Sequence, residues 1–115
     1  MTSRTLLFLL SLACLPASAR AADAVDAVVR GAPSCGEWVA QRKKADTLAL
    51  GNATWAVGYL SGLGAGSGRN AFGGRDNGAV FAWMDNYCRT NPLKDVAAGG
   101  KALMAEPPNR KDAAK

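Results

Sequence analysis

The sequence predicts an all-α fold, a small bundle of about four helices stapled by one disulfide. No segment alternates apolar and polar residues in the way that a strand with one exposed face does. Apolar residues instead recur three and four positions apart, and helix-capping residues precede several of these runs. At 115 residues the chain makes one small domain, which we place at 22–106, and its limited core would gain from a covalent link.

The beginning of the chain has the pattern of a secretory signal peptide, which we place at 1–21. Arg4 precedes an apolar run over 6–15, and small residues follow at Ala19 and Ala21. We expect cleavage near Ala21, with a second frame after Ala19, and a periplasmic or secreted protein. A membrane anchor is one alternative, although the run is too short to span a bilayer. Lipid attachment at Cys14 is another.

Two cysteines, Cys35 and Cys88, remain after loss of the leader. An even pair in a small exported domain favours one disulfide, whose closure of a long loop would add about 4 kcal/mol to stability. The alternative is two free thiols or a redox site, but the sequence has no Cys-x-x-Cys spacing. Loss of Arg4 and Arg20 with the leader also lowers the net charge from +5 to +3.

The first predicted helix covers about 35–44. Ser34 and Glu37 have the spacing of a capping box, in which each side chain accepts a hydrogen bond from the backbone N–H of the other residue. Trp38 falls on the apolar face of this helix. The basic run 42–44 is typical of a solvated helix end, where cations interact favourably with the helix dipole.

A second helix is predicted to begin with Asn52 as its cap and to pack through an apolar face that includes Trp55 and Tyr59. Gly58 and Gly62, four residues apart, leave a bare ridge on this helix. Because glycine costs nearly 1 kcal/mol at a helical position, we expect the close approach of another backbone to compensate.

The segment 64–78 contains six glycines and is predicted to be a mobile loop. Part of it has the glycine spacing of a dinucleotide fingerprint, but no strand precedes it, so we expect no nucleotide cofactor. Phe72 is the best candidate for an exposed apolar contact. Together with Arg69 and Arg75 it forms the predicted partner-binding site.

A third helix follows this loop. Either Asp76 or Asn77 caps it, and it runs to about residue 90. Its apolar stripe includes Trp83 and Tyr87, which we expect to pack against the other helices.

A fourth helix is predicted to begin with Asn91 as cap and Pro92 at the first helical position, where the missing N–H of proline costs nothing. Leu93 is the first residue of its apolar face. Pro107 ends the helix, and 107–115 is predicted to be a disordered basic tail.

The sequence lacks histidine, which excludes Ser–His and Cys–His nucleophile pairs and imidazole metal ligands. Among the carboxylates, capping accounts for Glu37 and Asp76, and Asp85 is expected on a solvated helix face. We therefore expect no enzyme and no catalytic, metal-binding or cofactor-binding residues. The cations are scattered along an exported chain, which argues against nucleic acid as a partner.

Three segments together resemble the HdeA/HdeB acid-stress chaperones. Residues 34–39 (Ser-Cys-Gly-Glu-Trp-Val) are similar to that family's Thr-Cys-acidic-acidic-aromatic-aliphatic segment, and residues 56–60 (Ala-Val-Gly-Tyr-Leu) to its Ala-Val-Gly-aromatic helix. Residues 80–88, which end in the second cysteine, and 94–103 resemble its closing helices. The resemblance covers about 34–104 and keeps the number and order of the cysteines.

The resemblance implies a disulfide between Cys35 and Cys88 in a small helical bundle. It also implies an ATP-independent periplasmic chaperone, a homodimer at neutral pH that dissociates in acid and exposes an apolar surface to unfolding clients. Without histidine, such a switch would depend on the nine carboxylates and would operate below about pH 5. Their protonation would raise the net charge of the processed chain from +3 toward about +12, and like-charge repulsion would loosen a dimer.

The chain also departs from that family, because 64–78 has no counterpart there and 83–87 is more aromatic, so we regard it as a divergent branch. A second hypothesis is a binding module for one exported protein partner, since the Rap/Tai immunity proteins are also small, helical and disulfide-bonded. Such a module would use Phe72 and the arginines of the loop. A third hypothesis is a structural accessory without an activity of its own.

Overall fold

The computed structural model describes residues 28–108 and confirms the all-α prediction. The predicted leader at 1–21 and the predicted tail beyond residue 108 lie outside the described residues. Within 28–108 there is no β-strand, only an isolated antiparallel bridge between Ser34 and Asp95. Four helices make the fold: α1 (Cys35–Lys44), α2 (Thr47–Ser67), α3 (Asn77–Thr90) and α4 (Val96–Ala105).

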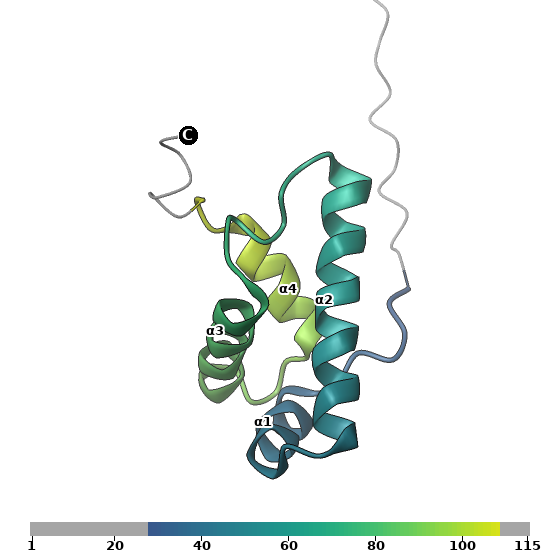
Figure 1. Ribbon diagram of the computed structural model, residues 1–115, viewed down its shortest axis with the longest axis vertical. Helices are drawn as coiled ribbons and strands as arrows, with labels where there is room; N and C mark the ends of the chain where they lie inside the picture. Colours follow the sequence, from purple (N-terminus) through teal and green to yellow (C-terminus); the bar gives the residue numbers. More distant parts are fainter. Residues whose placement is uncertain (1–27, 109–115) are drawn as a thin grey trace, which may run out of the picture.

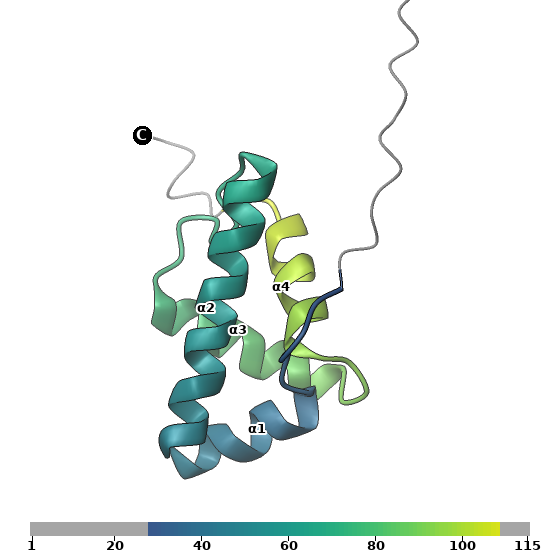
Figure 2. The same cartoon turned by 90° about the vertical axis from the view of Figure 1, so that its right-hand side faces the viewer.

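The helices form a closed ring in which α1 and α4 lie between α2 and α3 (Figure 1). α1 and α4 each pack against both α2 and α3. The view turned by 90° shows α1 crossing one end of the long α2, with α4 running beside α2 (Figure 2). Two backbone bonds join the starts of α1 and α4: Cys35 N–H donates to Lys94 O at 2.9 Å, and Val96 N–H donates to Pro33 O at 3.0 Å.

Each helix begins with a side chain that accepts a backbone N–H, and three of these four caps are aspartates: Ser34, Asp46, Asp76 and Asp95. The predicted cap of α1 is confirmed, since Glu37 N–H donates to Ser34 Oγ at 3.1 Å. Within 28–108 the Glu37 carboxylate does not return the bond, so half of the capping box forms. Of the two candidate caps for α3, the structure selects Asp76, which accepts from Ala79 N–H at 2.8 Å.

The predicted limits of the second helix are wrong at both ends. Asp46 caps α2 by accepting from Leu48 N–H at 3.0 Å and Ala49 N–H at 3.1 Å, so Asn52 lies inside the helix. At the other end the helix continues to Ser67, and Gly68 closes it with a left-handed φ of 65°. The loop predicted over 64–78 is therefore shorter, covering 68–76.

The predicted start of the fourth helix is also wrong. Asn91 ends α3, where its backbone N–H donates to Tyr87 O at 2.9 Å, and Pro92 lies in the turn that follows. Leu93, predicted to be on an apolar face, is 97% exposed. The helix begins at Val96, four residues later than the predicted start at Pro92, because Asp95 accepts from Ala98 N–H at 2.7 Å and so provides the cap.

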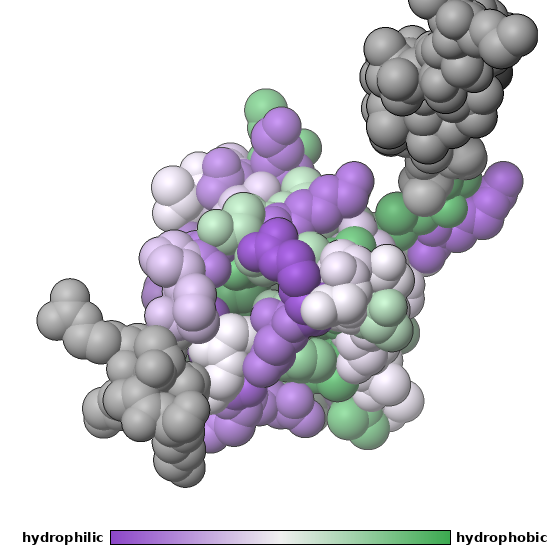
Figure 3. Space-filling model, turned by 90° about the horizontal axis from the view of Figure 1, so that it is seen from above, coloured by the Kyte–Doolittle hydropathy of each residue, from purple (hydrophilic) through white to green (hydrophobic). Residues whose placement is uncertain are grey.

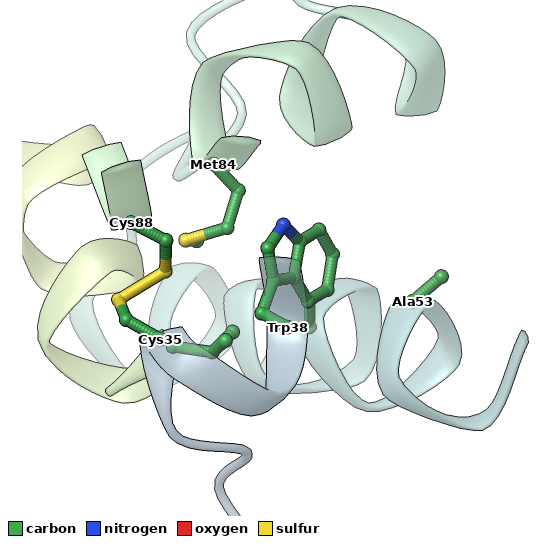
Figure 4. Packing of buried hydrophobic residues seen from close by; sticks show 7 residues of the cluster. Cys35, Trp38, Ala53, Met84 and Cys88 are labelled. Carbon is green, nitrogen blue, oxygen red and sulfur yellow. A yellow bond between two sulfur atoms is a disulfide. The ribbon is translucent and has the colours of Figure 1, made fainter. Parts of the chain in front are cut away.

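The predicted disulfide between Cys35 and Cys88 is confirmed and joins the first turn of α1 to the last turns of α3, with the Cα atoms 4.7 Å apart. A buried cluster surrounds it, and Figure 4 shows the indole of Trp38 between Met84 and Ala53. A second buried cluster lies between α2, α3, α4 and the 68–76 loop and contains Leu60, Ala71, Val80 and Leu103. Only the first cluster contains a covalent link between helices.

The prediction that another backbone approaches Gly58 and Gly62 closely is wrong, since a Cβ built at either position would meet no neighbouring atom within 4 Å. The close approach occurs instead on α4. A Cβ at Gly100 would lie 3.0 Å from the ring of Tyr59, and a Cβ at Gly99 would meet the Sδ of Met84. Glycines on α4 thus make room for side chains of α2 and α3, whereas the ridge on α2 is open.

Candidate functional site

The three residues of the predicted partner-binding site hold the 68–76 loop against the bundle. Arg75 pairs with Glu106 at 2.8 Å, and a guanidinium nitrogen of Arg69 donates to Met104 O at 3.3 Å. Phe72, expected to be exposed, is half-buried and packs against the second buried cluster. These contacts fasten the loop to the end of α4.

The five aromatic residues predicted to pack between helices do so in three places. Trp38 is fully buried in the first cluster. Trp55 stacks on Tyr59 with ring centroids 5.0 Å apart, and Trp83 stacks on Tyr87 at 5.3 Å. The aromatic side chains therefore serve the core and its margins.

Asp85 was expected to face water, but it connects α1 to α3. Its Oδ1 accepts from the indole Nε1 of Trp38 at 2.7 Å and from Nε of Arg42 at 3.0 Å. The guanidinium of Arg42 also lies 5.7 Å from the centroid of the Trp38 ring, within the range of a cation–π contact. Arg42, expected on a solvated helix end, is thus part of the interface between the helices.

The remaining carboxylates of 28–108 have structural roles of the same kind. Three aspartates cap helices, and Glu106 accepts from Trp83 Nε1 at 2.9 Å while pairing with Arg75. Glu37 lies in the first turn of α1, where a negative charge is favourable. No group of three potential metal ligands occurs among the described residues. These carboxylates hold helix ends and join elements of the fold.

The surface that stands out is the outward side of α2, which we call the outer face of α2 and define as Leu50, Thr54, Val57, Gly58, Ser61 and Gly62. The whole helix, Thr47–Ser67, contains no charged residue, yet it buries only Ala49, Ala53, Ala56 and Leu60. Leu50 is 68% exposed. Exposed apolar side chains on a helix without charged residues mark a candidate interaction surface.

Two apolar hollows flank Gly58 on the outer face of α2. One measures about 490 Å³ and lies between α2 and α3, with Leu50, Val57 and Phe81 among its lining residues. The other measures about 460 Å³ and lies between α2 and the segment that precedes α1, with Trp55 and Tyr59 in its wall. Because Gly58 lines both, the bare ridge connects the two hollows, and Arg30 is the charged residue of their combined lining.

The end of the molecule at which α2 terminates is different. Figure 3 shows strongly hydrophilic side chains across the middle of this end, with hydrophobic residues visible between them. The uncharged character is therefore a property of the outer face of α2 and not of the whole surface. The signal for it is present in the sequence as an unbroken run of uncharged residues from Thr47 to Gly68.

The fold and this surface define a small disulfide-linked helical protein with a candidate protein-binding face. No protein-family model, no curated protein and no solved structure matches the chain. Among residues 28–108, no helix combines the length and the apolar character that crossing a membrane requires. Disulfides persist in oxidising compartments, so the Cys35–Cys88 bond fits a location outside the cytoplasm.

Proposed function

We propose that this protein is exported to the periplasm through the leader at 1–21 and there binds unfolding client proteins in acid, without ATP. It would be a divergent relative of the HdeA/HdeB chaperones. The observation that carries the proposal is the use of the carboxylates: within 28–108, every one except Glu37 accepts a hydrogen bond that fixes a helix start or joins two elements.

Acid would weaken all of these contacts together. A protonated carboxyl group loses its attraction for a helix N-terminus and for a neighbouring guanidinium. Asp85 would lose its ion pair with Arg42, and Glu106 would lose its ion pair with Arg75. The chain has no histidine that could respond at a higher pH, so the transition would occur below about pH 5.

The two buried clusters would respond differently. The first contains the Cys35–Cys88 disulfide, which does not depend on pH and would keep α1 and α3 together. The second is covered by the 68–76 loop, and the ion pair of Arg75 with Glu106 is one of the contacts that attach this loop to the end of α4. Release of this loop would expose Leu60, Val80 and Leu103 beside the uncharged α2, which gives an apolar surface for unfolded clients.

A client-aggregation assay tests the proposal. A protein that unfolds and aggregates at pH 2–3 is mixed with an excess of this chain, and light scattering is followed. We expect suppression at pH 2–3 and none at pH 7. Undiminished aggregation of the client at pH 2–3 would contradict the proposal.

A matched pair of variants locates the client surface. Gly58→Lys places a charge on the outer face of α2 that persists in acid, and Gly58→Ala changes the same position without charge. Neither side chain has a neighbour to displace at its Cβ, so both variants should fold. We expect Gly58→Ala to protect the client and Gly58→Lys to protect it several-fold less.

The second candidate function is a binding module for one exported protein at neutral pH. The outer face of α2 favours it, because this surface is present in the folded state and needs no acid to form. Purification of the chain at pH 7 with a stoichiometric partner, retained by Gly58→Ala and lost by Gly58→Lys, would favour this function. Client protection restricted to pH 2–3 would favour the first.

A further inference from the structure

A second surface, beside the Cys35–Cys88 disulfide, combines positive charge with an apolar floor. Two adjoining hollows of about 270 Å³ and 370 Å³ lie along the seam between α1 and α3. Val39, Lys43 and Arg89 line both of them, so the two hollows form one groove. We call it the α1–α3 groove.

The cations of the α1–α3 groove are not equivalent. Arg42 is neutralised by Asp85, with which it forms an ion pair at 3.0 Å. Lys43 and Arg89 have no carboxylate partner among residues 28–108, and Arg89 bonds only to the neutral side chain of Asn86. Two positive charges from two different helices therefore face one groove without compensation from the described part of the chain.

The floor of the groove is apolar and fixed. Val39, Ala40 and Pro92 line it together with the disulfide, which joins α1 to α3 with the Cα atoms of Cys35 and Cys88 4.7 Å apart. A groove between covalently joined helices needs little ordering when a ligand binds, and this lowers the entropic cost of association.

We propose that the α1–α3 groove binds an acidic segment of a partner protein, with two carboxylates placed against Lys43 and Arg89 and an apolar side chain against Val39. The charge of the groove selects a negatively charged ligand, and its apolar floor selects one that also carries carbon-rich side chains. An anionic membrane is a poorer match, because lipid surfaces are bound by clusters of about four to eight cations and this groove offers two. The site is distinct from the outer face of α2 and acts at neutral pH, where the carboxylates of the ligand are charged.

Fluorescence anisotropy with a labelled peptide tests this inference. The probe is a peptide of about ten residues in which glutamate alternates with leucine, and the matched control peptide has glutamine in place of glutamate. Binding is measured at pH 7 in low salt to the oxidised full-length chain. We expect the acidic peptide to bind, the glutamine peptide to bind at least about tenfold more weakly, and added salt to weaken the acidic complex.

Variants assign the binding to the groove. The double variant Lys43→Gln/Arg89→Gln should weaken binding about tenfold or more, whereas Lys101→Gln, which removes an exposed cation of α4, should leave it within twofold. Both residues of the double variant are exposed, and circular dichroism checks that it remains helical. Equal binding of the two peptides, or full binding by the double variant, would overturn the proposal. Binding of anionic lipid vesicles through Lys43 and Arg89 without binding of the acidic peptide would also overturn it.

Loss of this peptide site would leave the acid chaperone proposal intact. Client protection is measured at pH 2–3, where glutamate side chains are largely uncharged, and it is assigned to α2 by the Gly58 variants. The two proposals therefore fail independently.

Discussion

The indole Nε1 of Trp38 donates a hydrogen bond of 2.7 Å to Oδ1 of Asp85, which joins α1 to α3 one helical turn away from the disulfide. The Trp38 side chain is 0% exposed, so this N–H has no access to water. The two helices thus share two links at neighbouring positions. The covalent link is independent of pH, whereas the link through Asp85 depends on a carboxylate.

Replacement of Asp85 tests the second link. We expect Asp85→Ala to lower the free energy of unfolding by about 1–3 kcal/mol, because the buried N–H of Trp38 is left without an acceptor. Asp85→Asn retains an oxygen at this position and should cost less. Urea unfolding at pH 7, followed by tryptophan fluorescence, measures both. A loss below about 0.5 kcal/mol in Asp85→Ala would show that the bond does not stabilise the fold.

Alanine substitutions should distinguish the open glycines of α2 from the packed glycines of α4. Gly58→Ala and Gly62→Ala should each raise stability by about 0.5–1 kcal/mol, since alanine favours the helix and the new methyl group meets nothing. Gly100→Ala should lower stability by about 1–3 kcal/mol, because its methyl group presses on the ring of Tyr59. Thermal unfolding of the three variants measures the contrast, and the same sign of change at Gly58 and Gly100 would contradict it.

Tyr59 should make the fold sensitive to alkali. Burial, and to a smaller extent the carboxylate of Asp95, raises the pKa of the Tyr59 hydroxyl above its ordinary value. The folded state therefore favours the neutral phenol, and the associated stability is present below about pH 10 and is lost as the pH rises through the folded pKa.

Tyr59→Phe tests this pH dependence. The hydroxyl is buried and has no hydrogen-bond partner within 28–108, so its removal should leave stability at pH 7 unchanged or higher. In denaturant titrations between pH 8 and pH 11, the variant should lose less stability than the wild type. Parallel curves for the two proteins would show that Tyr59 is not the responsible group.

Glu106→Gln should loosen the 68–76 loop at neutral pH. The substitution removes the charge that holds Arg75 but keeps an oxygen for the indole of Trp83. Trypsin cleavage after Arg69 or Arg75 should accelerate about fivefold, as expected for local opening made easier by ~1 kcal/mol. Glu37→Gln is the control, because Glu37 joins no two elements, and its cleavage rate should match the wild type. Equal rates in all three proteins would show that Glu106 does not control the loop.

Signals close together in the sequence predicted much of this fold. The Ser34 cap is predictable because its partner lies three residues away, and the pairing of Cys35 with Cys88 is predictable because only these two cysteines follow the predicted leader. Local signals were also ambiguous: Asn52 and Asn91 are as suitable for capping as Asp46 and Asp95, and only the packing of whole helices decides between them.

The candidate site depended more on tertiary structure. The placement of α1, α3 and α4 decides which pair of glycines faces a neighbour. It also decides whether Asp85 contacts water or an indole, and no local sequence pattern carries that information. The outer face of α2 is the exception. Its lack of charge is visible in the sequence, but its exposure becomes clear only when α1 and α4 are seen to cover the opposite side.

We expect acid to open the second buried cluster while the disulfide keeps α1 and α3 together. Fluorescence of a dye that binds exposed apolar surface, recorded for the oxidised protein from pH 7 to pH 2, tests this most directly. We expect low fluorescence at pH 7 and a cooperative rise below about pH 5, as the carboxylates that hold the helix starts and the loop lose their charge. A signal that stays flat down to pH 2 would contradict the account.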